Sequence, residues 1–195
     1  MAEAAVDLYW LPLGAGGWFV RWNGKVYEGL VAARDRRPRR DLYHSALIVQ
    51  APEGTFVIES APIRGSDGAE RGVVAEGAVG SRLLGRFKLF RYELRCWREG
   101  TIPDLAEAVE SPRRLSADPG VASRLLALLP SVPTPVWGRD ELRTGDMWNS
   151  NSFVSWLIVS SGLQVESVRP PAGGRAPGWA AGLVVATRGA GRVGP

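Results

Sequence analysis

The segment DMWNSNSFVSWLIVSSG, residues 146–162, decides the fold, because it joins a short polar stretch to an apolar run of helical length. We expect a helix over about residues 150–161, closed by Gly162 in the left-handed conformation. The predicted helix is apolar on almost every side, which is typical of a helix in the middle of a domain. We therefore expect the remaining elements to pack around it.

The polar residues at the start of this helix allow two interpretations. Backbone N–H groups in the first turn of a helix lack helical partners and lie at the positive end of the helix dipole, so they stabilise an oxyanion. Ser150 is thus a candidate nucleophile. Asn149, Ser150 and Asn151 are equally the residue types that cap helices, where a good cap contributes about 1 kcal/mol. The chain contains 1 histidine, so acid–base chemistry at Ser150 would depend on His44.

The composition indicates a single folded domain. A chain of 195 residues with 45% hydrophobic and 23% charged residues can bury a sizeable core. We expect one domain over residues 1–188 and a flexible tail at 189–195. The net charge of +4 comes mainly from arginine, and the charged loop 34–41 has no interleaved aromatic residues. This pattern disfavours nucleic acid as a partner.

The cysteine and histidine counts exclude several kinds of site. The single cysteine cannot form an intramolecular disulfide, and together with one histidine it cannot build a common zinc site. We expect no metal and no cofactor, and we expect Cys96 to be a core thiol on a strand. The N-terminal residues lack the positive charge of a secretion signal, and no apolar run approaches the ~20 residues of a membrane-spanning helix. We expect a cytoplasmic protein without a membrane span.

The first part of the chain is predicted to be rich in strands. Its expected elements are a strand at residues 6–13, a hairpin of 18–22 with 25–27 around Asn23-Gly24, and a hairpin of 43–50 with 55–60. The sequence Ala51-Pro52-Glu53-Gly54 suits the turn of the last hairpin. Both strands of that hairpin are nearly continuously apolar, which is typical of strands covered on both faces at the centre of a fold. His44 lies at the start of the first of them.

The second part mixes helices and strands. Its expected elements are a polar connection at 65–80, a strand at 86–97, a short helix at 104–110, a helix at 119–129 and a last strand at 179–187. Asp118 is the expected N-cap of the helix at 119–129, with a proline at the first helical position. Together these elements predict an α+β fold, in which an antiparallel β-sheet or partial barrel packs on a buried central helix.

The order of these parts resembles the circularly permuted papain-like superfamily, which includes NlpC-type proteins and lecithin:retinol acyltransferase-like enzymes. The similarity lies in a strand-borne histidine, a carboxylate on the neighbouring strand, a long insertion, and the sequence Asn149-Ser150-Asn151-Ser152-Phe153 opening a buried helix. By this resemblance Ser150 stands where the family has its cysteine nucleophile, and His44 is the catalytic histidine. The residue that orients the imidazole is Glu59 or, if the hairpin register differs by one residue, Ser60. Glu59 is the preferred candidate.

The resemblance implies a hydrolase or acyltransferase that acts on an amide or ester bond. Ser150 would attack the carbonyl with His44 as a concerted general base, because a serine hydroxyl does not ionise as a cysteine thiol does. Glu59 would hold the imidazole in place. The expected substrate is a small molecule, a lipid or a peptide, bound by Asn149, Asn151, Trp148 and Tyr43.

A second function from a different class is a catalytically inactive papain-like domain that binds an acyl, peptide or protein ligand in the same cleft. Trp148, Trp137 and the arginine-rich loop 34–40 would then supply apolar contact and anion recognition. Trp148 is also expected as a core residue that anchors the start of the helix. A Ser150 hydroxyl within about 4 Å of a His44 ring nitrogen in an open cleft would separate both functions from a Ser150 that only caps the helix. Separating the enzyme from the binding domain needs a chemical test.

Overall fold

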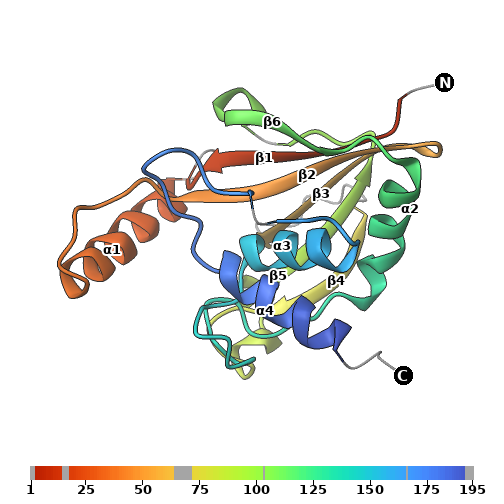
Figure 1. The fold of residues 1–195 in the computed structure, drawn as a ribbon. Helices are drawn as coiled ribbons and strands as arrows, with labels where there is room; N and C mark the ends of the chain where they lie inside the picture. The colour runs from red at the N-terminus through yellow and green to blue at the C-terminus, as the bar shows by residue number, and fades with distance from the viewer. Residues whose placement is uncertain (1–2, 15–17, 64–71, 103, 166, 192–195) are drawn as a thin grey trace.

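The computed structural model has an α+β fold built on one six-stranded sheet with the strand order β4-β5-β3-β2-β1-β6 (Figure 1). The structure describes residues 3–14, 18–63, 72–102, 104–165 and 167–191. All neighbouring strands of the sheet are antiparallel. The expected α+β class, with an antiparallel sheet against a central helix, is confirmed.

The elements follow one another from a first strand to a last helix. The strands are β1 (Ala5–Pro12), β2 (Tyr43–Ala51), β3 (Gly54–Pro62), β4 (Val73–Ala78), β5 (Arg91–Arg98) and β6 (Val109–Ser116). The α-helices are α1 (Trp18–Arg34), α2 (Pro119–Leu128), α3 (Ser150–Ser160) and α4 (Trp179–Ala190). Short 3-10 turns lie at η1 (Leu84–Arg86), η2 (Lys88–Phe90), η3 (Leu105–Glu107) and η4 (Leu129–Ser131).

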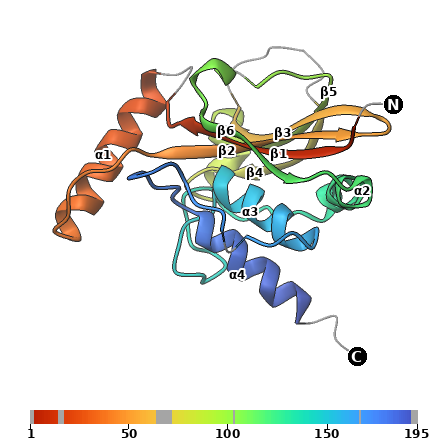
Figure 2. The same ribbon diagram turned by 45° about the horizontal axis from the view of Figure 1, so that its top comes forward.

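The sheet has two faces with different coverings. We call the face toward α2, α3 and α4 the inner face, and these three helices lie together on it in both views (Figures 1 and 2). Its core combines residues of β1, β2, β3 and β5 with Phe153 and Leu157 of α3. The other face, which we call the outer face, carries a smaller core of Leu11, Ala46, Val57 and Ile102. Alternation of side chains along each strand assigns every strand residue to one of these faces.

The central hairpin and the central helix match the sequence prediction. Strands β2 and β3 pair from Leu47↔Ile58 to Ala51↔Gly54 in the middle of the sheet. Helix α3 is buried along most of its length. It ends in the expected glycine cap: Gly162 has φ +87°. The Leu163 N–H donates to the Ile158 carbonyl at 3.2 Å, which is the wider bond of a Schellman motif. The expected helix at 119–129 is confirmed as α2, with Asp118 as its N-cap.

The last element is a helix, α4, and the strand predicted at 179–187 is wrong. A continuous apolar run fits either structure, and here the buried residues Trp179, Gly182 and Ala186 recur at the three- and four-residue spacing of a helix. The backbones of α3 and α4 come very close, because a Cβ placed on Gly182 would lie 2.0 Å from the Ser152 carbonyl oxygen. Helix α4 continues through Ala190, two residues into the expected tail, and residues 192–195 lie outside the described residues.

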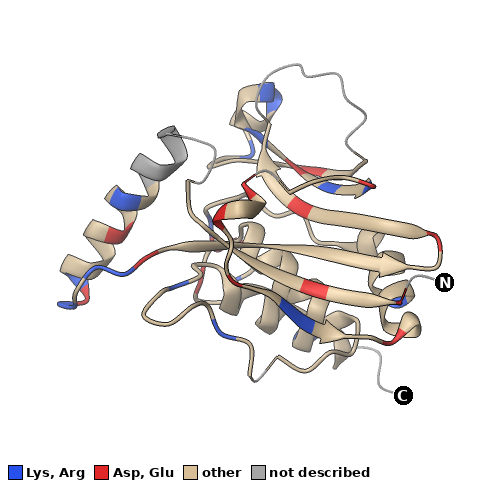
Figure 3. Ribbon diagram, turned by 90° about the horizontal axis from the view of Figure 1, so that it is seen from above, with Lys and Arg blue, Asp and Glu red and all other residues tan. Residues whose placement is uncertain are grey.

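The hairpin predicted around Asn23-Gly24 is also wrong, since residues 18–34 form helix α1. Gly24 serves close packing instead of a turn: a Cβ there would lie 2.7 Å from the Leu13 side chain. Seen from above, α1 stands to one side of the sheet (Figure 3). Its buried Glu28 is held by ion pairs with Arg37 and Arg175, so the arginine loop anchors α1.

Three further expectations fail in part. Within the polar connection predicted at 65–80, residues 73–78 form the edge strand β4. The short helix predicted at 104–110 is the single turn η3, followed by the edge strand β6. Strand β6 contains Pro112, which an edge strand tolerates. The strand predicted at 86–97 starts later, at Arg91, after two 3-10 turns.

Candidate functional site

His44 lies on the outer face of the sheet, away from helix α3. Its neighbour on β1 is Leu11, a member of the outer core, and residues opposite each other in an antiparallel pair share a face. The next residue, Ser45, bonds to α3 from the inner face. Burial lowers the pKa of His44 to about 4, an effect that the charge of Asp104 opposes. The predicted Ser150–His44 pair is therefore wrong, because strand alternation sends the imidazole to the opposite side of the sheet.

Glu59 shares the outer face with His44. It lies two residues after Val57 of the outer core and pairs across strands with Arg95. The Arg95 guanidinium donates to Glu59 at 3.3 Å and to Glu93 at 2.8 Å, and both Glu59 and Arg95 are buried. The carboxylate thus belongs to an ion-pair group on the outer face, so the expected grouping of Glu59 with Ser150 is wrong as well. Ser60, the alternative third member, faces inward beside Leu94.

The start of α3 is a complete cap. The Asn149 side chain accepts hydrogen bonds from the N–H groups of Asn151 and Ser152, and the Ser152 hydroxyl accepts the N–H of Asn149. This reciprocal arrangement is a capping box. Ser152 also donates to the Gly178 carbonyl at 2.7 Å, which ties α3 to the start of α4. The capping interpretation of Asn149 is confirmed.

Asn151 connects three segments that are distant in the sequence. The Ser45 hydroxyl donates to Asn151 Oδ1 at 2.9 Å, and Asn151 Nδ2 donates to the carbonyls of Tyr43 and Pro177. Every polar atom of the Asn151 side chain is engaged, and Asn151 is 2% exposed. Asn151, predicted to bind a ligand, instead joins β2 to α3. Ser150 itself is buried and has no hydrogen-bond partner for its hydroxyl among the described residues.

Tyr43 and Trp148 are members of the inner core. A Cβ on Gly174 would lie 2.4 Å from the Tyr43 ring, so the chain around Gly174 packs directly on this ring. Trp148 is 2% exposed, and its indole nitrogen has no partner among the described residues. The same holds for the indole nitrogens of Trp10 and Trp179 and for the Ser60 hydroxyl. Trp148 is therefore the core anchor of the helix start, as expected.

The carboxylate nearest to Ser150 in the sequence is Asp146. Its two oxygens accept the N–H groups of Met147 and Gly178, both at 2.8 Å. Burial raises its pKa. These bonds fix the loop before α3 against the start of α4. Cys96 is half-buried against the inner core, and burial raises the pKa of its thiol to about 11, so it is a poor nucleophile near neutral pH.

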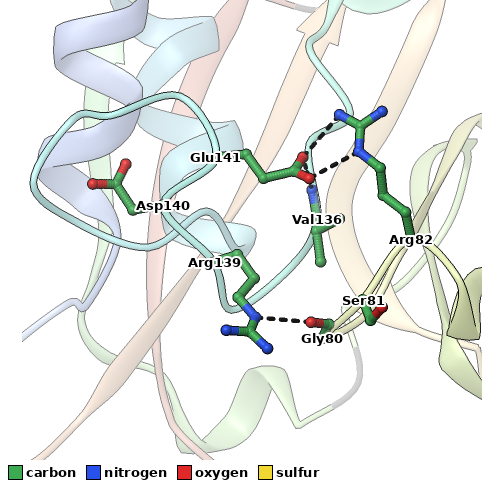
Figure 4. A pocket seen from close by; sticks show the side chains of 7 residues that line it. All are labelled: Gly80, Ser81, Arg82, Val136, Arg139, Asp140 and Glu141. Atoms are coloured by element: carbon green, nitrogen blue, oxygen red, sulfur yellow. Dashed lines mark hydrogen bonds and ion pairs between the residues drawn. The ribbon is translucent and has the colours of Figure 1, made fainter.

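A cavity lies away from α3, where the connection of β4 to β5 meets the loop before α3 (Figure 4). It measures about 460 Å³ and is lined by Gly80, Ser81, Arg82, Val136, Arg139, Asp140 and Glu141. Arg82 forms an ion pair with Glu141 at 2.8 Å across it, and Arg139 donates to the Gly80 carbonyl. This cavity is open and charged, and none of the residues that line it belongs to α3.

Beside the cavity, residues 82–89 expose an uncommon combination of side chains. Leu83, Phe87 and Leu89 are 69%, 62% and 77% exposed, and the basic residues Arg82, Arg86 and Lys88 lie between them. We call residues 82–89 the apolar-basic segment. Residues 86–89 of this segment were predicted to belong to a strand, and residues 82–85 to no helix or strand. The sequence does contain a pattern that indicates this segment, because apolar and basic residues are interspersed from Ser81 to Tyr92 without an acidic residue.

No family model, curated protein or solved structure matches this chain. Within the described residues, no group of three or more His, Cys, Asp and Glu side chains could hold a metal ion. In the same residues, no helix has the length and apolar character needed to cross a bilayer. The interpretation of the site therefore depends on its own geometry.

Proposed function

We propose that this chain is a non-catalytic binding domain. It shares the lack of catalysis with the second function expected from the papain-like resemblance, but it binds at another surface than the cleft beside Ser150. The observation that carries the proposal is the bond between Ser45 and Asn151 on the inner face, with His44 on the outer face. The position of β2 that contacts the first turn of α3 holds a serine and not an imidazole. A serine nucleophile needs a general base within hydrogen-bond distance, and Ser150 has none.

The polar groups around Ser150 support the same conclusion. The hydrogen bonds of the polar side chains here are formed with the helix cap and with neighbouring segments, as for Asn149, Asn151 and Ser152. Asp146 uses both carboxylate oxygens for backbone N–H groups. An active site keeps such groups available for substrate, whereas here they hold β2, α3 and α4 together.

The binding surface that we propose is the apolar-basic segment with the cavity beside it. Large apolar side chains cost free energy when water surrounds them, so a group of them on one exposed segment indicates an interaction site. The ligands that suit this surface are apolar and anionic. The basic residues of the segment carry its charge: Arg86 and Lys88 are exposed, and the Arg82 side chain remains 79% exposed despite its ion pair with Glu141.

Two measurements test this function. The catalytic arm treats the protein, Ser150→Ala and Ser160→Ala with a fluorophosphonate probe and with an acyl ester. We expect no labelling and no hydrolysis above background. Labelling or hydrolysis that Ser150→Ala removes and Ser160→Ala retains would overturn the proposal.

The binding arm uses anilinonaphthalene sulfonate, an apolar anion whose fluorescence rises on binding. We expect saturable binding to the folded protein and at least tenfold weaker binding to the double variant Phe87→Ser, Leu89→Ser. The matched control is Leu30→Ser on α1, which removes a leucine that is 70% exposed at another surface. Equal binding to all three folded proteins would count against the surface that we name.

A further inference from the structure

We propose that the apolar-basic segment, residues 82–89, docks the protein on the surface of an anionic lipid bilayer. This inference rests on the proposed binding function and names its partner. The segment leaves the sheet after β4 and returns to it at β5 through the turns η1 and η2. It supplies both kinds of side chain that interfacial docking needs.

The first kind is apolar. Leu83, Phe87 and Leu89 are each more than three-fifths exposed, and Leu84 is 38% exposed. Side chains exposed to this extent project from the surface and do not line a groove. A projecting leucine or phenylalanine can enter the boundary between headgroups and acyl chains without a matching pocket. A protein partner would have to bury them in a well-packed surface of complementary shape.

The second kind is basic. Arg86 and Lys88 are exposed between the apolar residues, Arg82 precedes them in an ion pair with Glu141, and no acidic residue occurs from Ser81 to Tyr92. Arg86 and Lys88 have no ion pair within the described residues. Each Lys or Arg near an anionic leaflet strengthens membrane binding by about fivefold. The charge therefore matches an anionic bilayer, and it disfavours a second copy of the chain, since self-association through this segment would bring like charges together.

The segment presents these side chains from an ordered backbone. The N–H groups of Gly85, Phe87 and Phe90 donate to carbonyls within the two turns. The Arg91 guanidinium donates to the Gly85 carbonyl at 2.6 Å, and a Cβ on Gly85 would lie 2.7 Å from the Ala78 side chain, so the turn packs on β4. Docking thus requires little additional ordering of the backbone, which favours binding.

The test is co-sedimentation of the full chain with large vesicles of phosphatidylcholine, with and without phosphatidylglycerol. We expect binding to the mixed vesicles, weak binding to phosphatidylcholine alone, and loss of binding at high salt. The double variant Arg86→Gln, Lys88→Gln should bind the mixed vesicles roughly 25-fold more weakly. The double variant Phe87→Ser, Leu89→Ser should lose at least tenfold.

The matched control is the double variant Lys25→Gln, Leu30→Ser, which makes the same kinds of change on exposed residues of α1. It should bind as the unchanged protein does. All changed side chains are exposed, so circular dichroism should show unchanged folding. A second readout is an environment-sensitive dye on Leu89→Cys, whose emission should shift to the blue on mixed vesicles, whereas the same dye on Leu30→Cys should not shift.

Equal binding to both kinds of vesicle, or no effect of either segment variant, would overturn membrane docking. Absence of vesicle binding together with intact anilinonaphthalene sulfonate binding would also overturn it, and would direct attention to an acidic protein partner while the binding function stands. Hydrolysis that depends on Ser150 would instead overturn the proposed function. The two failures are therefore distinguishable.

Discussion

The Ser45 hydroxyl of β2 donates a hydrogen bond to Asn151 Oδ1 in the first turn of α3, at 2.9 Å. Both residues are almost completely buried. Asn151 Nδ2 continues the contact to the Tyr43 and Pro177 carbonyls, so one side chain joins the sheet, the central helix and the chain leading to α4. This contact occupies the place where the resemblance predicted a reacting pair.

Replacement of Asn151 should therefore affect stability. Asn151→Ala removes three hydrogen bonds and leaves buried polar groups without partners, so we expect a loss of about 2 to 4 kcal/mol in the free energy of unfolding. Urea denaturation measures it. The matched change in the adjacent residue, Ser150→Ala, should cost less than about 1 kcal/mol, because no partner is lost. A large effect of Ser150→Ala with a small effect of Asn151→Ala would show that the roles are reversed.

Replacement by alanine should affect the free energy of unfolding differently at two buried serines of the inner face. Ser60 has no hydrogen-bond partner for its hydroxyl among the described residues, whereas Ser45 has Asn151. Removal of an unpaired buried hydroxyl relieves a desolvation penalty, so Ser60→Ala should leave the free energy of unfolding unchanged or raise it by about 1 kcal/mol. Ser45→Ala should lower it by about 1 to 2 kcal/mol. Thermal and urea unfolding check both, and a destabilised Ser60→Ala would contradict the assignment.

The glycines of α4 provide a further matched pair. A Cβ on Gly182 would lie 2.0 Å from the Ser152 carbonyl, while nothing lies within 4 Å of a Cβ on Gly189. Gly182→Ala must push α4 away from α3 and should cost about 2 kcal/mol or more. Gly189→Ala should stabilise the protein by up to about 1 kcal/mol, since alanine reduces the freedom of the unfolded chain. Similar melting temperatures for the two variants would rule out the close contact of the helices.

The central helix and hairpin were predictable because several local signals agreed. Helix α3 has a capping sequence, an apolar run of helical length and a terminal glycine, and all three point to the same structure. The hairpin of β2 and β3 has apolar strands around a turn sequence. By contrast, the Asn-Gly signal at residues 23–24 was overridden by packing of Gly24 against Leu13.

The candidate site was not predictable because the strand bearing His44 is nearly all apolar. Residues 46–49 read Ala-Leu-Ile-Val, and a strand buried on both faces gives no polar alternation that would assign its faces. A shift of one residue decides whether His44 or Ser45 meets α3. The sequence pattern supported the strand but did not show whether His44 or Ser45 faces α3. This difference changes the function that we propose from catalysis to binding.

The position of His44 also predicts how stability depends on pH. Burial lowers the pKa of His44 from 6.5 to about 4, so between these values the unfolded chain binds a proton that the folded protein does not. The free energy of unfolding should fall as the pH decreases from 6.5 to 4, by up to about 3 kcal/mol from this group, and His44 should have no effect above pH 6.5.

The chain has 1 histidine, so the imidazole signals of the untagged protein report His44 without assignment, and NMR titration should give a midpoint near pH 4. The variant His44→Gln should show a shallower fall in stability over the same range, because carboxylates alone then titrate. A midpoint near 6.5 would mean that the imidazole is solvated. In that case the burial of His44 and the pH dependence derived from it would be wrong, whereas its outer-face position follows from its pairing with Leu11.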